Sequence, residues 1–236
     1  MSVWTRRYHV LNKDVNMFQD MRTSRLMEIL QQACIAHTEE LGMGRDKTLD
    51  KGILWVVLQQ TMRITRMPVY DEDITIESWP GNTMHVLFPR FFDILDHNGN
   101  LMLEGSYLWT LINAETRKMV FADQYGIDIP GDASGKQIDL PKPVRRMETD
   151  QERLFTVPFS YCDLNGHMNN TKYFDLAEDT IQAIASHKKL TSVTTEYAAE
   201  ARYRETIRVS WKEEENFCYL SGDAEKNCFR ISMTFD

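Results

Sequence analysis

Three side chains that could carry out proton transfer lie within five positions of one another: Asp163, Asn165 and His167. A carboxylate, a carboxamide and an imidazole at this spacing could orient a water molecule and move a proton, because an imidazole titrates near neutral pH. If the segment is extended, the alternation places all three side chains on one side. The same pattern is typical of a polar turn that only caps a helix, and this second interpretation stays open on these residues alone.

An amphipathic helix is predicted directly after this cluster, over about residues 171–187. Asn169 or Asn170 can accept hydrogen bonds from the free N–H groups of its first turn. Apolar residues then recur at helical spacing and predict one buried face, which comprises Tyr173, Leu176, Ala177, Thr180, Ile181 and Ile184. The backbone N–H groups of Gly166 and His167 would lie at the positive end of this helix. We therefore expect these two groups to form an oxyanion hole.

Composition places the chain among ordinary globular proteins. It has 236 residues, of which 42% are hydrophobic and 26% are charged, so it can bury a sizeable core. Its formal net charge of −8 argues against a general nucleic-acid or membrane-surface binder. No apolar run is long enough to span a bilayer. We expect neither a nucleic acid nor a membrane as a partner.

The four cysteines, Cys34, Cys162, Cys218 and Cys228, are scattered without a metal-ligand spacing. Free thiols in a reducing cytoplasm fit this usage, and we expect no metal site and no cofactor. The first residues lack the apolar core of a signal peptide. A cytoplasmic location is the expectation.

The order of predicted elements occurs twice along the chain. The first half begins with a strand over residues 3–12 and a helix over 23–41 whose buried stripe includes His37, expected to be a core histidine. Antiparallel strands follow at 52–58, 61–67, 73–79, 90–95 and 103–112. The second half has a strand at 154–160, the helix described above, and strands at 194–203, 206–211, 217–222 and 228–235. A long helix against an antiparallel sheet, repeated, indicates an α+β protein with two domains.

Residues 124–151 are rich in proline and glycine and have little periodicity, which predicts a linker between a domain at 1–123 and a domain at 152–236. A weak sequence similarity between the two halves aligns Asp14-Val15-Asn16 with Asp163-Leu164-Asn165. This alignment places Phe18 opposite His167 and Met67 near the position of Glu200. Only the second half would then carry a polar site.

With this organisation, the sequence resembles the acyl-acyl-carrier-protein (acyl-ACP) thioesterases of plant plastids and their bacterial relatives, which are tandem hotdog proteins. The resemblance is carried by Asp163-x-Asn165-x-His167-x-Asn169-Asn170-x-x-Tyr173 and by Thr195-Glu196-Tyr197-Ala198-Ala199-Glu200. It implies two tandem hotdog domains. It also implies hydrolysis of acyl-ACP to free fatty acid and holo-ACP in fatty acid biosynthesis.

The resemblance implies that Asp163, Asn165, His167 and Glu200 are the catalytic residues. Glu200 would be general base or nucleophile, and the sequence leaves this choice open. Many plant members have a cysteine directly after this glutamate, where this chain has Ala201. Cys162 is the nearest thiol, but we expect it to point away from Asp163 and His167. Since no transit peptide is evident, a bacterial cytoplasmic member is the expectation.

The first half is expected to supply the acyl-chain pocket, with Met27, Trp55 and Met62 as substrate-binding walls. The expected partner is acyl carrier protein, an acidic protein that would dock on a basic pair, either Arg145 and Arg146 or Lys188 and Lys189. A homodimer is left open. The alternative functions are an acyl-CoA thioesterase on the same fold and a non-catalytic acyl-binding or dimerisation module. A hotdog hydratase fits less well, because its helix-start signature spaces Asp and His differently from Asp163 and His167.

Overall fold

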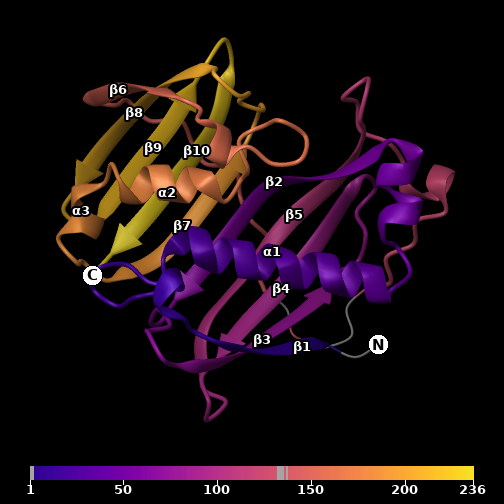
Figure 1. Ribbon diagram of the computed structural model, residues 1–236, viewed down its shortest axis with the longest axis horizontal. Helices are drawn as coiled ribbons and strands as arrows, with labels where there is room; N and C mark the ends of the chain where they lie inside the picture. The colour runs from indigo at the N-terminus through magenta and orange to yellow at the C-terminus, as the bar shows by residue number, and fades with distance from the viewer. Residues whose placement is uncertain (1–2, 132–135, 137) are drawn as a thin grey trace.

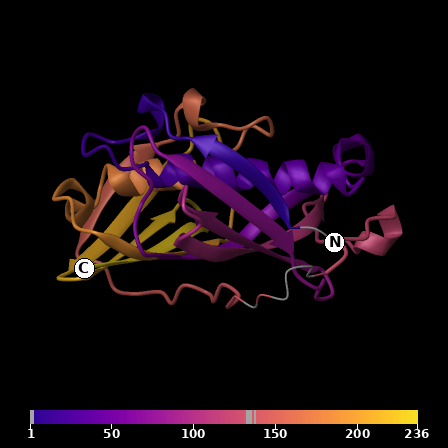
Figure 2. The same cartoon turned by 90° about the horizontal axis from the view of Figure 1, so that it is seen from below.

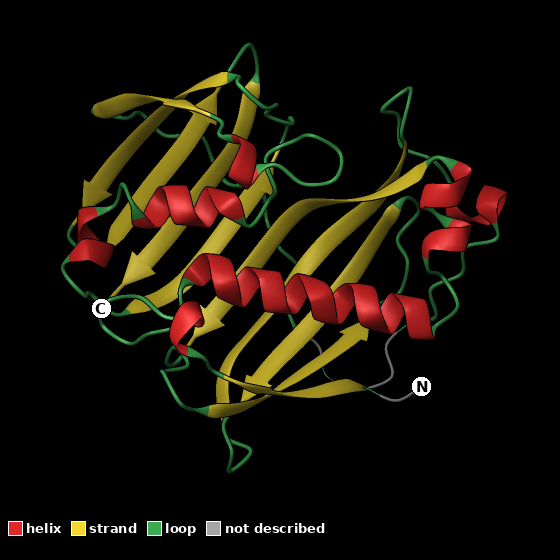
Figure 3. Cartoon of the chain, in the orientation of Figure 1, coloured by secondary structure: helices red, strands yellow, loops and turns green. Residues whose placement is uncertain are grey.

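The computed structural model describes residues 3–131, 136 and 138–236. The strands of the first half are β1 (Trp4–His9), β2 (Ile53–Ile64), β3 (Asp73–Pro80), β4 (Leu87–Leu95) and β5 (Leu101–Asn113). Those of the second half are β6 (Gln151–Thr156), β7 (Leu190–Tyr197), β8 (Thr206–Glu214), β9 (Phe217–Asp223) and β10 (Asn227–Phe235). Together they form one antiparallel sheet, and the helices lie against one of its faces (Figures 1 and 3).

The strand order of this sheet shows that the chain is an internal repeat. The order is β1-β3-β4-β5-β2-β7-β10-β9-β8-β6, so each half, taken from its outer edge inward, runs first, third, fourth, fifth and second strand. The second strands of the two halves, β2 and β7, pair at the centre, with Gln60 opposite Thr195. The predicted α+β arrangement and the predicted repetition are both confirmed.

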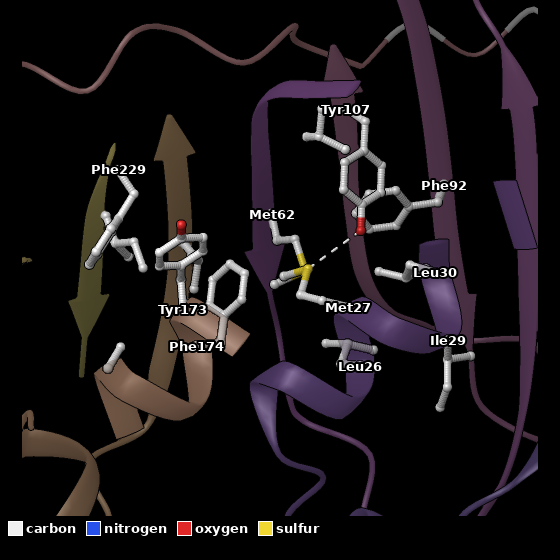
Figure 4. Close-up of a cluster of buried hydrophobic side chains, with 14 of the residues drawn as sticks. Leu26, Met27, Ile29, Leu30, Met62, Phe92, Tyr107, Tyr173, Phe174 and Phe229 are labelled. Carbon is white, nitrogen blue, oxygen red and sulfur yellow. Dashed lines mark hydrogen bonds between the residues drawn. The ribbon is translucent and has the colours of Figure 1, made fainter. Parts of the chain in front are cut away.

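Helix α1 (Thr23–Glu40) packs its apolar stripe onto the first half of the sheet. Leu26, Leu30 and Ala33 are fully buried, as the helical spacing predicts. Phe92 and Tyr107 meet them from β4 and β5, and the Tyr107 hydroxyl donates to Met27 Sδ at 3.4 Å (Figure 4). Full burial of one such aliphatic or aromatic side chain stabilises the fold by about 1.5–3 kcal/mol.

The second helical segment is shorter than predicted, because it divides into α2 (Lys172–Glu178) and α3 (Gln182–Ala185). Tyr173, Leu176 and Ala177 of α2 are buried, as expected. The Thr180 hydroxyl donates back to the Leu176 carbonyl at 2.6 Å, and Ile181 has an extended backbone. Glu213 of β8 then accepts from the N–H groups at the start of α3. The interruption therefore depends on a strand that is distant in sequence.

Two sequence runs that were predicted as separate strands form the single strand β2. A bulge between Val57 and Gln59 shifts the pairing with β5, and this shift changes which residues face α1. Short 3₁₀ turns complete the described structure: Asn12–Asp14, Arg45–Lys47, Leu49–Lys51, Ala122–Tyr125 and Phe159–Tyr161.

The segment predicted as a linker forms no helix or strand between Tyr125 and β6 in its described part; residues 132–135 and 137 lie outside the described residues. Its described part from residue 138 onward crosses the sheet on the face opposite the helices (Figure 2). Along this face Ser106 donates to the Asp139 carbonyl at 2.7 Å, and the Val144 N–H donates to Glu196 at 2.9 Å. The division into domains at residues 123 and 152 stays a prediction, because β2 and β7 join both halves in one sheet.

Candidate active site

The polar cluster forms a tight turn rather than an extended segment, so the prediction of three alternating side chains is wrong. The Asp163 N–H donates to the His167 carbonyl at 2.8 Å, and the Gly166 N–H donates to the Asp163 carbonyl at 3.0 Å. Asp163 Oδ1 accepts from the N–H groups of Asn165 and His167 at 2.8 and 3.3 Å. Gly166 has a φ of +77°, in the left-handed region that glycine adopts without strain. Asp163 therefore fixes the positions of Asn165 and His167.

This geometry contradicts the predicted oxyanion hole. The N–H of Gly166 and the N–H of His167 both donate within the turn, to the carbonyl and to the carboxylate of Asp163. Helix α2 begins only at Lys172, so neither group lies at its first turn. Asn169, in contrast, acts as the predicted cap, because its side chain accepts from the Thr171 N–H and hydroxyl. An oxyanion would need other donors.

The late carboxylate and the imidazole meet, as the proposed site requires. Glu200 Oε1 lies 3.5 Å from His167 Nδ1. The backbone holds the two segments together, since the Met168 N–H donates to the Ala201 carbonyl at 2.8 Å and His167 pairs with Arg202 in an isolated bridge. The two residues thus form a carboxylate–imidazole pair across two loops of the second half.

The surroundings of His167 lower the pKa of its imidazole. Its partial burial lowers the pKa of the imidazole most strongly, and the positive charge of Arg117 lowers it further, whereas Asp163 raises it. A neutral imidazole can accept a proton at neutral pH, as acid–base catalysis requires.

Arg117 is a site residue that sequence reasoning missed. It belongs to the turn after β5 in the first half, yet its guanidinium forms an ion pair with Glu200. It lies in the half of the chain for which the sequence predicted no polar site. Nothing in the local sequence of this turn signals a contact so distant in the chain.

A cavity of about 360 Å³ lies beside the turn, between the C-terminal half of α1 and the sheet. Asp163, Asn165 and Asn169 form part of its wall, and the rest is mainly apolar. The apolar wall includes Ile53, Leu54, Trp55, Phe88 and Trp109. An apolar cavity next to convergent polar groups is the usual form of a small-molecule site.

Of the three predicted substrate-binding residues, only Trp55 lines this cavity, where it meets Phe88 edge-to-face with ring centroids 4.9 Å apart. Met27 and Met62 are 1% exposed and belong to the core between α1 and the sheet (Figure 4). The bulge in β2 separates Trp55 from Met62 along the strand.

Buried Arg90 also lines the cavity and contacts His37, which is a core histidine as predicted. Arg90 Nη2 lies 2.6 Å from His37 Nδ1, and Arg90 Nε donates to the Ser78 hydroxyl at 2.8 Å. Burial, followed by the charge of Arg90, lowers the pKa of His37 to about 4.

The Cys162 thiol lies away from the carboxylate–imidazole pair. The Cys162 Sγ donates to the Pro158 carbonyl at 3.6 Å and lines a different, polar cavity with Arg25 and Lys172. This placement agrees with the expectation that Cys162 points away. Ala201 is fully buried beside Glu200.

Among the described residues, no group of three or more His, Cys, Asp or Glu side chains is placed to hold a metal ion, and no helix is long and apolar enough to cross a membrane.

In the part of the chain that the structure describes, no ion pair joins either predicted basic pair to Glu200. Arg145 and Arg146 follow Val144, whose N–H donates to Glu196 of β7. Lys188 and Lys189 precede β7, whereas Glu200 follows the other end of that strand.

The first half contains the same turn, which corrects the predicted alignment of the two halves. Asn16 Oδ1 accepts from the N–H groups of Phe18 and Asp20, and the Asn16 N–H donates to the Asp20 carbonyl. Asn16 therefore occupies the place of Asp163, and Asp20 the place of His167. The predicted alignment of Asp14 with Asp163 is wrong by two positions.

The counterpart of Glu200 was predicted correctly. The Met21 N–H donates to the Pro68 carbonyl, just as the Met168 N–H donates to the Ala201 carbonyl. Met67 consequently corresponds to Glu200. The first half keeps the turn but has a methionine where the second half has its catalytic candidate.

Comparisons with known proteins agree with this architecture. The profile of the acyl-ACP thioesterase N-terminal domain matches residues 1–124, and that of the acyl-ACP thioesterase C-terminal domain matches residues 144–227. The chain is 21% identical over 214 residues to the chloroplastic palmitoyl-acyl carrier protein thioesterase of Cuphea hookeriana, which covers 84% of this chain and 52% of that protein. It is 22% identical over 214 residues to the chloroplastic dodecanoyl-[acyl-carrier-protein] hydrolase of Cinnamomum camphora, covering 84% of this chain and 56% of that one. The chain thus spans about half the length of the curated relatives it matches.

Solved structures share the fold over the full length. An acyl-ACP thioesterase from Bacteroides thetaiotaomicron superimposes with a TM-score of 0.86 at 19% identity, covering 99% of this chain and 98% of that one. The 12:0-ACP thioesterase from Umbellularia californica gives a TM-score of 0.81 at 18% identity, with coverage of 99% and 97%. Because both domain profiles match and together span most of the sequence, the chain belongs to the acyl-ACP thioesterase family.

Proposed function

We propose that this protein hydrolyses acyl-ACP thioesters and releases a free fatty acid and holo-ACP. The observation that carries the proposal is the approach of Glu200 Oε1 to His167 Nδ1 at 3.5 Å, next to a turn whose other face lines an apolar cavity. Membership of the acyl-ACP thioesterase family supports the same reaction.

In this proposal Glu200 acts as general base. It takes a proton from water while the water oxygen bonds to the thioester carbonyl carbon, and the carbonyl oxygen becomes an oxyanion. When the intermediate collapses, the C–S bond breaks and the thiolate leaves. The proton passes through His167 to the sulfur, so that the products are a carboxylic acid and a thiol. Direct attack by Glu200, with hydrolysis of the resulting anhydride, is the second route, and oxygen exchange into Glu200 distinguishes the two.

The turn contributes Asn165 rather than the backbone donors expected from the sequence. The Asn165 carboxamide lies in the cavity wall and makes no hydrogen bond within the described residues. Its N–H groups are free to donate to the developing oxyanion, and loss of one such donor typically costs about 3–4 kcal/mol of activation free energy. Asp163 keeps this carboxamide in place through the Asn165 N–H.

Hydrolysis of acyl-ACPs of graded chain length, measured for the wild type and for Glu200→Gln and His167→Ala, tests the proposal. Both substitutions should lower kcat by roughly 10²–10⁴-fold, whereas Cys162→Ala should retain most activity. Unchanged turnover in both variants would refute the assignment of Glu200 and His167, and the absence of turnover in the wild type would leave an acyl-binding or dimerisation module. A strong preference for acyl-CoA over acyl-ACP would show that the substrate is a CoA thioester rather than an acyl-ACP.

We also propose an acidic acyl carrier protein as the partner, docked on basic side chains near Glu200. Arg202 and Arg204 are exposed on the segment that follows Glu200, and the Arg204 guanidinium lies 5.0 Å from the Tyr203 ring. These residues replace the basic pairs suggested by the sequence.

The cytoplasmic location is likewise proposed, with four free thiols as its support. Static light scattering would decide whether the protein is a homodimer.

A further inference from the structure

Arg117 contacts the proposed catalytic pair from the first half of the chain, whereas Glu200 and His167 belong to the second half. We propose that Arg117 is a positioning residue for thioester hydrolysis, whose guanidinium holds the Glu200 carboxylate next to His167. The inference rests on the proposed function. It makes the site a joint product of the two halves, because the base comes from the second half and its restraint comes from the first.

The turn that carries Arg117 is built to hold one conformation. The Arg117 N–H donates to the Asn113 carbonyl at 3.0 Å, and the Asn113 N–H donates to the Lys118 carbonyl at 2.9 Å. Asn113 Oδ1 accepts from the N–H groups of Glu115 and Thr116 at 3.1 and 2.8 Å. These bonds enclose Arg117 and fix the direction from which its side chain leaves the backbone.

Arg117 itself has a φ of +56°, in the left-handed region. This conformation costs a non-glycine residue about 1–2 kcal/mol and persists only where the surrounding structure imposes it. A glycine at this position would remove the cost. The chain instead has an arginine, and its guanidinium reaches the carboxylate of Glu200.

Glu200 needs such a restraint, because little else holds its side chain. It lies in the irregular segment after β7 and is 36% exposed, and its carboxylate has His167 and Arg117 as its partners among the described residues. A glutamate at the surface populates several rotamers, and ordering it has an entropic cost. The planar guanidinium can bind both carboxylate oxygens, which fixes orientation as well as distance.

The charges around His167 come from three segments. Arg117 approaches from the turn after β5, Asp163 belongs to the same turn as His167, and Glu200, Arg202 and Glu205 come from the segment between β7 and β8. Burial and the charges of Arg117 and Arg202 oppose protonation of the imidazole, and the carboxylates favour it. Removal of Arg117 should therefore make His167 easier to protonate.

The test compares Arg117→Gln, Arg117→Lys and the control Lys118→Gln in pH–rate profiles on acyl-ACP. Lys118 is the exposed neighbour in the same turn, so its substitution removes an equal charge without touching Glu200. Arg117→Gln should lower kcat roughly 10- to 100-fold and move the acid limb of the profile to higher pH. Arg117→Lys should recover part of kcat and keep the acid limb near that of the wild type. Equal effects of Arg117→Gln and Lys118→Gln would overturn the proposal.

A second measurement needs no turnover and separates this inference from the proposed function. NMR titration of His167 in the wild type and in Arg117→Gln should show a higher imidazole pKa in the variant, and equal values would overturn the inference. A wild type that hydrolyses no thioester refutes the function, yet this titration still decides whether Arg117 acts on the pair. If Arg117→Gln does not fold, Asn113→Ala releases the turn while keeping the guanidinium, and an unchanged acid limb and kcat in that variant would also overturn the proposal.

Discussion

Glu178 of α2 accepts a hydrogen bond at 2.6 Å from the backbone N–H of Thr23, the first residue of α1. A carboxylate of the second half thus caps the long helix of the first half. Burial raises the pKa of Glu178 to about 7. The contact therefore titrates in the physiological range.

Glu178 should make the protein less stable as the pH rises. Because its pKa is higher in the folded protein than the ordinary value of 4.5, the folded state binds more protons than the unfolded state between pH 4.5 and 7. The contribution of this group to the free energy of unfolding consequently falls across that window. Glu178→Gln should remove this fall, measured by urea unfolding at several pH values. The exposed Glu225→Gln is the control, and parallel pH profiles for wild type and Glu178→Gln would contradict the prediction.

His37 should make the protein less stable as the pH falls. Its pKa is about 4 in the folded protein and 6.5 ordinarily, so the unfolded state binds more protons between these values. The stability that neutral His37 contributes is present above pH 6.5 and is lost as the pH falls toward 4. His37→Gln should weaken this acid-induced loss, followed by thermal unfolding from pH 7 to pH 4. His97→Gln, in an exposed hairpin, should behave as the wild type; the same acid sensitivity in His37→Gln would refute the assignment.

Gly166 should be needed for the shape of the catalytic turn rather than for space around it. A Cβ at this position meets no atom within 4 Å, but the φ of +77° disfavours other residues. Gly166→Ala should cost about 1 kcal/mol of stability and lower kcat by displacing Asn165 and His167. Gly166→Asn should be milder, because asparagine tolerates this conformation.

Gly42 offers a matched control for that experiment, since it has a φ of +75° and an equally open surrounding and lies just after α1. Gly42→Ala should carry a similar stability cost with kcat unchanged. Equal losses of kcat in the two alanine variants would show that the effect is one of general stability.

Substitutions at Trp55 and Met62 should have different effects, because Trp55 lines the cavity and Met62 belongs to the core. Trp55→Ala enlarges the cavity, so the preferred acyl chain should become longer in assays with graded acyl-ACPs. Met62→Ala leaves a hole in the buried core and should cost about 2–5 kcal/mol of stability, with the chain-length profile unchanged. A shift in chain length caused by Met62→Ala alone would reverse this division.

Much of the fold could be predicted, because its pattern is local. Alternation along the strands and the stripe of Leu26, Leu30 and Ala33 on α1 depend on periodicities of two and 3.6 residues, which the sequence displays directly. The break between α2 and α3 could not be predicted in this way. It depends on Glu213, which reaches the start of α3 from β8.

The site was predicted only in part, because some of its contacts join segments that are distant in the sequence. The meeting of Glu200 and His167 was expected from the family resemblance and not from spacing. The predicted oxyanion hole was wrong because the Asp163 side chain, at the start of the turn, accepts a hydrogen bond from the N–H of His167. Arg117 was missed because its relation to Glu200 exists only after the halves of the sheet have joined.

That junction limits how the molecule can admit a substrate. β2 and β7 share an antiparallel register from Gln59 opposite Glu196 to Arg63 opposite Ser192. Swinging the halves apart would break this ladder in the middle of the sheet, where each lost backbone hydrogen bond is costly. Substrate entry by a hinge motion between the halves is therefore disfavoured, and the surface segment that carries the highly exposed Leu164 in the cavity wall is a more accessible route.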